Sequence, residues 1–171
     1  SGTSDYCVWI PASTVLDVLT GESDTDWATD KLTRRSKTCG RVGVGGAPLV
    51  QFVRTQAVLA TSSGESEFYG AVSAVFEMLL LHRGLKFLGV ILPMRHGLDS
   101  TAARGIASRS GVGKVKHLEI KTLWLQQFTN PNSSRAEERV ELFKVDTEHC
   151  GSDIGTKPLA EDRLKYLAHL C

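Results

Sequence analysis

Hydrophobic and polar positions alternate along the first third of the chain in a way that predicts three strands. The segment Val15–Ser23 alternates loosely and is rich in β-branched and aliphatic residues, which favours an extended strand. Cys39–Val44 and Leu49–Val53 show the same pattern on either side of a glycine turn at 45–46, and the second continues through Ala57–Ala60. Because the links are short, we expect an antiparallel meander.

The hydrophobic period changes from two to 3.6 after this meander. Phe68 and Val75 recur at helical spacing with other apolar residues, which indicates a helix that buries one face. Ser62 followed by Glu65 is the pattern of a capping box at a helix N-terminus. The sequence therefore predicts a long helix over Ser63–Leu88.

The remaining chain alternates short strands and helices. The predicted elements are a strand at Val90–Leu98, a helix at Ser100–Ala107, an amphipathic helix at Leu118–Phe128, a strand at Val140–Val145 and a closing helix at Asp153–Leu170 that is broken at Pro158. Such an order favours the α/β class, with a five-stranded mixed sheet whose first three strands are antiparallel and whose faces carry helices.

Composition narrows the class of protein. With 171 residues, 42% hydrophobic and 23% charged, the chain fits one folded domain rather than a disordered or fibrous segment. Its most apolar stretch, Ala71–Met94, contains Glu77, Arg83 and Lys86, so we predict no membrane span and no membrane partner. Four cysteines far apart in the sequence favour reduced thiols in an intracellular protein over a disulfide framework.

Charge is segregated although the net charge is only +1. The stretch Asp17–Asp30 carries five acidic residues and no basic one, and Lys31–Arg54 carries six basic residues and no acidic one. A cation-dependent enzyme that acts on phosphates needs carboxylates for the metal and bases for the polyanion. The alternative is a solvated surface on which opposite charges pair across neighbouring strands.

Four carboxylates fall at junctions between predicted elements, where side chains distant in sequence can converge. They are Asp24, Glu67, Asp99 and Asp153. Magnesium ions prefer several hard, anionic oxygen ligands, and acids held on a rigid sheet supply them. A carboxylate at a junction is also a common helix cap or surface charge, so spacing alone leaves both interpretations open.

Six blocks, in order, resemble the signature blocks of the ribonuclease H domain of copia-type retrotransposon polyproteins. They are SDTDWA at 23–28, TRRS at 33–36, SSGESEFY at 62–69, LDS at 98–100, KHLEI at 116–120 and SDIGTKPL at 152–159. Each block alone is weak, but the similarity spans nearly the whole chain. The resemblance implies a ribonuclease H-like domain over 15–171, preceded by a remnant of an upstream connection segment at 1–14.

The resemblance also implies the chemistry. Its four acidic positions, Asp24, Glu67, Asp99 and Asp153, would be the catalytic residues and the ligands of two Mg²⁺ ions, with Mn²⁺ as a substitute. The expected substrate is the RNA strand of an RNA–DNA hybrid, and the expected partner is the reverse transcriptase domain of the same polyprotein. The cytoplasm, within a virus-like particle, is the expected location, with the nucleus as an alternative.

Two neighbouring acids are competing candidates for the metal ligands. Asp26 lies two residues after Asp24, and Glu65 lies two residues before Glu67. We prefer Asp24, which is the leading acid of its block, and Glu67, because the capping box would occupy the carboxylate of Glu65. Clustered acids without a metal should repel each other, so at least one should have a raised pKa.

Basic and imidazole side chains are the candidates for nucleic-acid contacts. They are Arg34, Arg35, Lys37, Lys116 and His117, with His149 as a possible auxiliary residue near the metals. Arginine and lysine would contact phosphates, while His149 would shuttle a proton or assist product release. Alternatively, the arginines belong to a solvated loop, His117 caps a helix and His149 is an ordinary loop histidine.

The chain departs from the family pattern after Asp99, where Ser100, Thr101 and Ala102 follow and a substrate-contacting amide is missing. This departure leaves a second hypothesis open, a decayed or domesticated module that binds nucleic acid without cleaving it. A nuclease that cuts DNA on the same fold is a third hypothesis, which the copia-type blocks disfavour.

Overall fold

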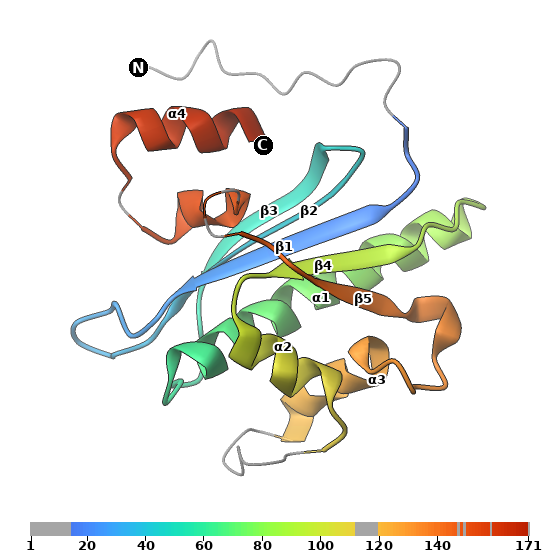
Figure 1. Ribbon diagram of the computed structural model, residues 1–171, viewed down its shortest axis with the longest axis horizontal. Helices are drawn as coiled ribbons and strands as arrows, with labels where there is room; N and C mark the ends of the chain where they lie inside the picture. Colours follow the sequence, from blue (N-terminus) through green and yellow to red (C-terminus); the bar gives the residue numbers. More distant parts are fainter. Residues whose placement is uncertain (1–14, 112–119, 147, 149, 158, 171) are drawn as a thin grey trace.

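The computed structural model describes residues 15–111, 120–146, 148, 150–157 and 159–170, and a five-stranded sheet forms its centre (Figure 1). The strands are β1 (Leu19–Asp26), β2 (Lys37–Val44), β3 (Ala47–Thr55), β4 (Met94–Leu98) and β5 (Val140–Lys144). Their order in the sheet is β3-β2-β1-β4-β5. The pairs β1–β2 and β2–β3 are antiparallel, whereas β1–β4 and β4–β5 are parallel. The predicted mixed sheet with three antiparallel strands is confirmed.

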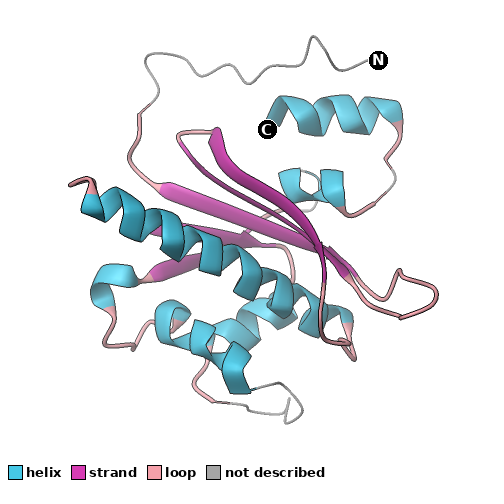
Figure 2. Cartoon of the chain, turned by 180° about the vertical axis from the view of Figure 1, so that it is seen from behind, coloured by secondary structure: helices cyan, strands magenta, loops and turns pink. Residues whose placement is uncertain are grey.

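Helices cover both faces of this sheet. They are α1 (Ser63–Phe87), α2 (Thr101–Ser108), α3 (Gln126–Thr129) and α4 (Glu161–Leu170), with 3₁₀ helices η1 (Ile120–Leu125), η2 (Ala136–Glu138) and η4 (Gly151–Gly155). Figure 2 shows α1 running across one face. The opposite face carries η4. A Cβ added at Gly155 of η4 would meet Cys39, whereas a Cβ added at Gly70 of α1 would meet Thr38. Thr38 and Cys39 are consecutive residues of β2, so their side chains point to opposite faces of the sheet.

The long helix α1 begins and packs as its sequence predicts. Ser62 caps it by accepting a hydrogen bond from the backbone N–H of Glu65 at 3.2 Å. Phe68, Val75 and Met78 are fully buried and belong to the hydrophobic core that also contains Leu19 of β1 and Leu98 of β4. This apolar face anchors the first turns of α1 beside the end of β1.

The first strand is shifted along the chain relative to its prediction. It starts at Leu19 instead of Val15, because Val15 and Leu16 are exposed and pair with no strand in the described part of the chain, and it continues past Ser23 to Asp26. The residues from Ser23 to Thr25 are polar yet buried. Their pairing with β2 and their cover by α1 and η4 keep this polar end extended, which hydrophobic periodicity does not indicate.

Two further strand boundaries also differ from the prediction. The predicted continuation of the third strand through Ala57–Ala60 is wrong, since β3 ends at Thr55. The buried Gln56 amide donates to Thr38 Oγ1 and to the Ser66 carbonyl, both at 2.9 Å, and turns the chain toward α1. The fourth strand begins at Met94 rather than Val90, after Pro93, which lacks the N–H that a ladder needs.

The C-terminal third departs most from the predicted helices. Residues 118–119 of the predicted helix at 118–128 lie outside the described residues, and the rest forms η1 followed by the single turn of α3. The predicted closing helix, which was expected to break at Pro158, is two elements, η4 and α4, with residues 156–160 between them in the sequence, and Pro158 itself lies outside the described residues. No helix among the described residues has the length and apolarity needed to cross a membrane.

Candidate metal centre

The parallel pairing of β1 and β4 brings two acidic side chains to the same edge of the sheet. Leu19 is in register with Met94 and Glu22 with Gly97, so the carboxyl ends of both strands meet. Asp24 is buried near the end of β1, and Asp99 follows β4 directly. Adjacent ends of parallel strands are where open α/β sheets gather their functional groups.

Glu67 reaches the same edge from the N-terminal part of α1. The backbone N–H and the hydroxyl of Thr25 donate to Oε1 of Glu67, at 3.2 and 2.9 Å. Ser66 Oγ in turn donates to Thr25 Oγ1 at 3.0 Å. These hydrogen bonds fix the carboxylate of a helix residue against the end of β1.

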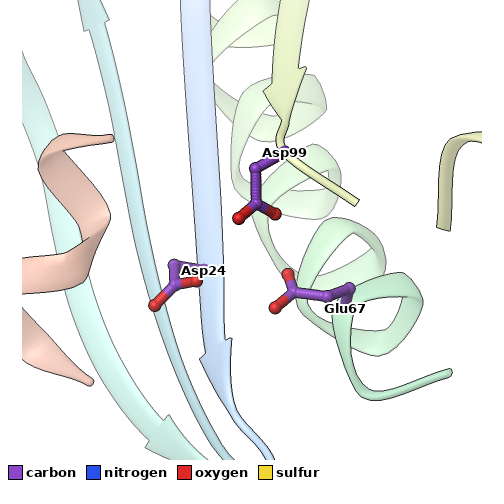
Figure 3. A group of neighbouring side chains, drawn as sticks. All are labelled: Asp24, Glu67 and Asp99. Carbon is purple, nitrogen blue, oxygen red and sulfur yellow. The ribbon is translucent and has the colours of Figure 1, made fainter. Parts of the chain in front are cut away.

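The three carboxylates form one cluster, shown in Figure 3. One oxygen from each of Asp24, Glu67 and Asp99 lies within 4.8 Å of the others. Neither competing acid takes part in it. Oε2 of Glu65 accepts from the Thr61 backbone N–H and hydroxyl, both at 2.7 Å, and its Oε1 accepts from the Tyr69 hydroxyl at 3.0 Å. The cluster therefore contains Asp24 and Glu67, the preferred candidates, and neither Asp26 nor Glu65.

Electrostatics within the cluster favour protonation when no cation is present. Burial raises the pKa of Glu67 to about 8, and the charges of Asp24 and Asp99 add to this effect while the Thr25 hydrogen bonds oppose it. Burial also raises the pKa of Asp24 to about 6, against a hydrogen bond from Thr156 and the charge of Lys157. The predicted rise in pKa is confirmed, with desolvation rather than repulsion as its largest cause.

The donor set of the cluster fits a divalent cation. Oε2 of Glu67 is buried and has no hydrogen-bond partner among the described residues. An unsatisfied buried carboxylate oxygen is costly, and a cation that faces it would remove that cost. Together with the oxygens of Asp24 and Asp99, it offers the hard, anionic ligands that magnesium and manganese accept.

Asp153 lies beside Asp24 but outside the group of three carboxylates. It is buried in η4, and its charge raises the pKa of Asp24. Lys157 Nζ lies 3.0 Å from Asp153 Oδ1 and 3.7 Å from Asp24 Oδ2, and Arg163 Nη2 lies 3.7 Å from Asp153 Oδ2. The fourth predicted acid therefore has two cationic partners.

The predicted basic residues of the β1–β2 loop extend from the same edge of the sheet. Arg34 and Arg35 lie in the loop, Lys37 is the first residue of β2 and lies opposite Asp26 in the β1–β2 ladder, and all three side chains are exposed. A backbone hydrogen bond from Arg34 to Asp30 at 2.8 Å orders the turn. Lys116, His117 and His149 lie outside the described residues.

Three residues that hold the acids in place were not predicted as site residues. Thr25 positions Glu67, Thr156 Oγ1 donates to Asp24 Oδ2 at 2.5 Å, and Lys157 bridges Asp24 and Asp153. All three belong to the signature blocks, so the blocks marked them. Spacing gave no role for them because their contacts depend on how η4 and α1 pack on the sheet.

Comparison with known proteins supports the resemblance found in the sequence. No family model matches the chain. Over 99% of its length, the chain is 24% identical to the retrovirus-related Pol polyprotein from transposon TNT 1-94 of Nicotiana tabacum, and it spans 12% of that polyprotein.

Two solved structures share the fold. LC11-RNase H1, solved in complex with an RNA/DNA hybrid, aligns with a TM-score of 0.51 and 12% identity over 77% of this chain and 88% of its own. The N-terminal RNase H domain of a Mycobacterium tuberculosis protein, fused to maltose-binding protein, aligns with a TM-score of 0.50 and 15% identity over 88% of this chain and 97% of its own. The fold is ribonuclease H-like. With the tobacco relative, it supports the predicted ribonuclease H domain of a retrotransposon Pol polyprotein.

Proposed function

We propose that this chain is a two-metal-ion endonuclease that cleaves the RNA strand of RNA–DNA hybrids during reverse transcription of a copia-type retrotransposon. The convergence of Asp24, Glu67 and Asp99 at the carboxyl edge of a ribonuclease H-like sheet carries this proposal. The hybrid in the LC11-RNase H1 complex supports the class of substrate, and the tobacco polyprotein supports the retrotransposon context.

The acidic residues would hold the ions. Asp24, Glu67 and Asp99 are the principal ligands, Asp153 is the fourth, and Mg²⁺ is the expected metal with Mn²⁺ as a substitute. Bound divalent ions supply water activation and charge stabilisation at the scissile phosphate. Thr25 keeps one oxygen of Glu67 fixed, and the other oxygen, which has no hydrogen-bond partner among the described residues, would hold an ion.

The exposed basic residues of the β1–β2 loop and of the start of β2 would bind the hybrid. Arg34, Arg35 and Lys37 contact phosphates, since guanidinium and ammonium groups neutralise backbone charge without reading sequence. Selection of the RNA strand requires recognition of its 2′-hydroxyl groups. Lys116 and His117 are further proposed contacts, and His149 is the proposed auxiliary residue.

The proposed context follows from the relative. The chain corresponds to a small share of a Pol polyprotein, so the proposed partner is the reverse transcriptase domain of the same polyprotein. The proposed location is the cytoplasm, within a virus-like particle, with the nucleus as the alternative.

A cleavage assay with matched variants tests the function. The domain is incubated with a labelled RNA–DNA hybrid in Mg²⁺ or Mn²⁺, beside duplex DNA and single-stranded RNA. Asp24→Asn removes one negative charge from the cluster and keeps the size of the side chain. We expect it to lose roughly two orders of magnitude or more in rate, because metal stabilisation is worth several kcal/mol, and to retain hybrid binding. Asp26→Asn, two residues along β1 and outside the cluster, should cleave at nearly the wild-type rate.

The outcomes separate the hypotheses. Hybrid-specific cleavage that depends on Asp24 and not on Asp26 supports the nuclease. Salt-dependent binding of the hybrid without cleavage in either metal supports the decayed or domesticated module. Preferential cleavage of duplex DNA supports the nuclease that cuts DNA.

A further inference from the structure

Lys157 places a positive charge between two of the acidic side chains at the metal centre. Its Nζ lies 3.0 Å from Oδ1 of Asp153 and 3.7 Å from Oδ2 of Asp24. Both carboxylates are buried, while the lysine side chain is 44% exposed. The ammonium therefore reaches the acids from the solvent side and can leave without unpacking the core.

The surroundings of Lys157 divide the acidic residues into two environments. The Lys157 ammonium lies near both Asp24 and Asp153, and the Arg163 guanidinium lies 3.7 Å from Asp153, so two cations balance these two carboxylates. At the cluster of Asp24, Glu67 and Asp99, a buried Glu67 oxygen has no hydrogen-bond partner among the described residues. The first environment already has its cations, whereas the second has an unsatisfied ligand.

We propose that Lys157 competes with a second divalent cation for Asp24 and Asp153, so that the domain binds one ion firmly at the cluster of three and a second only by displacing this ammonium. The inference rests on the proposed function, because it concerns the same metal centre. It adds a role for a residue of the SDIGTKPL block that neither spacing nor the acidic cluster explains. Lys157 is a residue that controls occupancy and does not contact the reacting atoms.

The competition is electrostatic. An ammonium and a divalent ion next to the same carboxylates repel each other. A fixed unit charge a few ångströms away weakens the binding of a divalent ion on the order of tenfold even at high dielectric. Displacement also costs the contact between Lys157 and Asp153. Asp24 belongs to both environments, so the first ion gains from removal of Lys157 as well, but less than the second.

Metal titration without substrate tests this role. Isothermal titration calorimetry of the metal-depleted domain with MnCl₂ should show a tighter and a weaker class of sites. Lys157→Met removes the charge and keeps most of the stem, and should tighten the weaker class on the order of tenfold. Lys157→Arg keeps the charge and should resemble the wild type. Lys165→Met is the matched control, since Lys165 pairs with Glu161 at the same four-residue spacing, 2.7 Å apart, without facing Asp24.

A second measurement uses the unaltered protein and does not depend on how the variants fold. Amine-selective labelling followed by peptide mass spectrometry compares Lys157 with Lys165 during the MnCl₂ titration. Labelling of Lys157 should rise across the weaker binding phase, when the ammonium leaves the acids, while labelling of Lys165 stays constant.

The failures are distinguishable. Equal affinities for wild type and Lys157→Met, or constant labelling of Lys157, overturn the inference and leave the proposed nuclease intact. A wild type that binds no Mn²⁺ overturns the proposed metal centre itself. Tightening in Lys157→Met and not in Lys165→Met, with labelling that follows the weaker phase, supports the inference.

Discussion

The hydroxyl of Thr25 donates a hydrogen bond of 2.9 Å to Oε1 of Glu67 and so joins the end of β1 to the first turns of α1. The backbone N–H of Thr25 donates to the same oxygen at 3.2 Å. Oε2 of Glu67 is buried and has no hydrogen-bond partner among the described residues. One threonine thus satisfies half of a buried carboxylate and leaves the other half for a cation.

Replacement of this threonine should weaken both the fold and the metal site. Thr25→Val keeps the shape of the side chain and removes the hydroxyl, so we expect a loss of about 1 to 2 kcal/mol in the free energy of unfolding. The pKa of Glu67 should rise further, because the Thr25 hydroxyl now lowers it, and Mn²⁺ should bind less tightly. Urea denaturation and MnCl₂ titration measure the two effects. Thr25→Ser, which keeps the hydroxyl, is the control, and an unchanged Mn²⁺ affinity in Thr25→Val would contradict this role.

The raised pKa of Glu67 predicts how stability depends on pH in the metal-free domain. Its pKa rises from an ordinary 4.5 to about 8 on folding, so the folded state holds the proton more tightly than the unfolded state. The stability from this group is fully present below pH 4.5 and is lost as the pH rises through about 8. Asp24, raised from 3.8 to about 6, contributes in the same direction over a lower range.

Glu67→Gln isolates the contribution of this group. In EDTA, the variant should become more stable than the wild type as the pH rises from 4.5 to 8, by roughly 2 kcal/mol at the upper end. Mn²⁺ at pH 8 should stabilise the wild type far more than the variant, because metal binding needs the ionised carboxylate. Urea denaturation across this pH range measures the free energy of unfolding of both proteins. A difference between wild type and variant that does not vary with pH would contradict the raised pKa of the buried Glu67 carboxyl.

Sequence patterns predicted the elements of the fold that bury an apolar face. The period change at Ser63 located α1, whose capping residue and buried face agree with the prediction. The polar end of β1 was not predictable in this way, since Ser23 and Thr25 are buried by the packing of α1 beside Gly70 rather than by their own hydrophobicity. The 3₁₀ helices were missed for a related reason, because their turns depend on tertiary contacts more than on a period of 3.6.

The acidic cluster was predictable from junction positions and signature blocks together. Parallel pairing of β1 with β4 explains why Asp24 and Asp99 meet. The position of Asp153 depends on the packing of η4 against β1 and β2, which no pattern indicates, and its pairing with Lys157 accompanies that packing. Side-chain pairing around a shared acid follows from three-dimensional packing. The sequence therefore predicts which acidic residues belong to the site but not which side chains contact them.

Two glycines of α1 predict opposite effects of the same substitution. A Cβ at Gly70 would lie 2.7 Å from Thr25 Cγ2, whereas a Cβ at Gly84 would meet nothing within 4 Å. Gly70→Ala should therefore destabilise the domain by about 1 to 3 kcal/mol and shift the turn that carries Glu67, with weaker Mn²⁺ binding. Gly84→Ala should stabilise it by roughly 0.5 to 1 kcal/mol through helix propensity. Thermal melts of both variants measure this contrast, and equal effects would mean that α1 packs less closely on β1 at Gly70.

Charge reversal in the β1–β2 loop tests the proposed contact with the hybrid. Arg34 and Arg35 are exposed on an ordered turn beyond the strand end that carries Asp24. If both neutralise phosphates, Arg34→Glu with Arg35→Glu should weaken hybrid binding and reduce the slope of log affinity against log salt by roughly two.

The control makes the same change in charge at the other end of the sheet. Arg95 is the second residue of β4, and Arg139 directly precedes β5, so both lie at the edge opposite the acidic cluster. Arg95→Glu with Arg139→Glu alters the net charge equally and should change the salt slope little, because these positions face away from the proposed path of the hybrid. Fluorescence anisotropy with a labelled RNA–DNA hybrid across a KCl series, in EDTA to prevent cleavage, measures both slopes. Equal losses in the two double variants would show that net charge, and not the loop, governs binding.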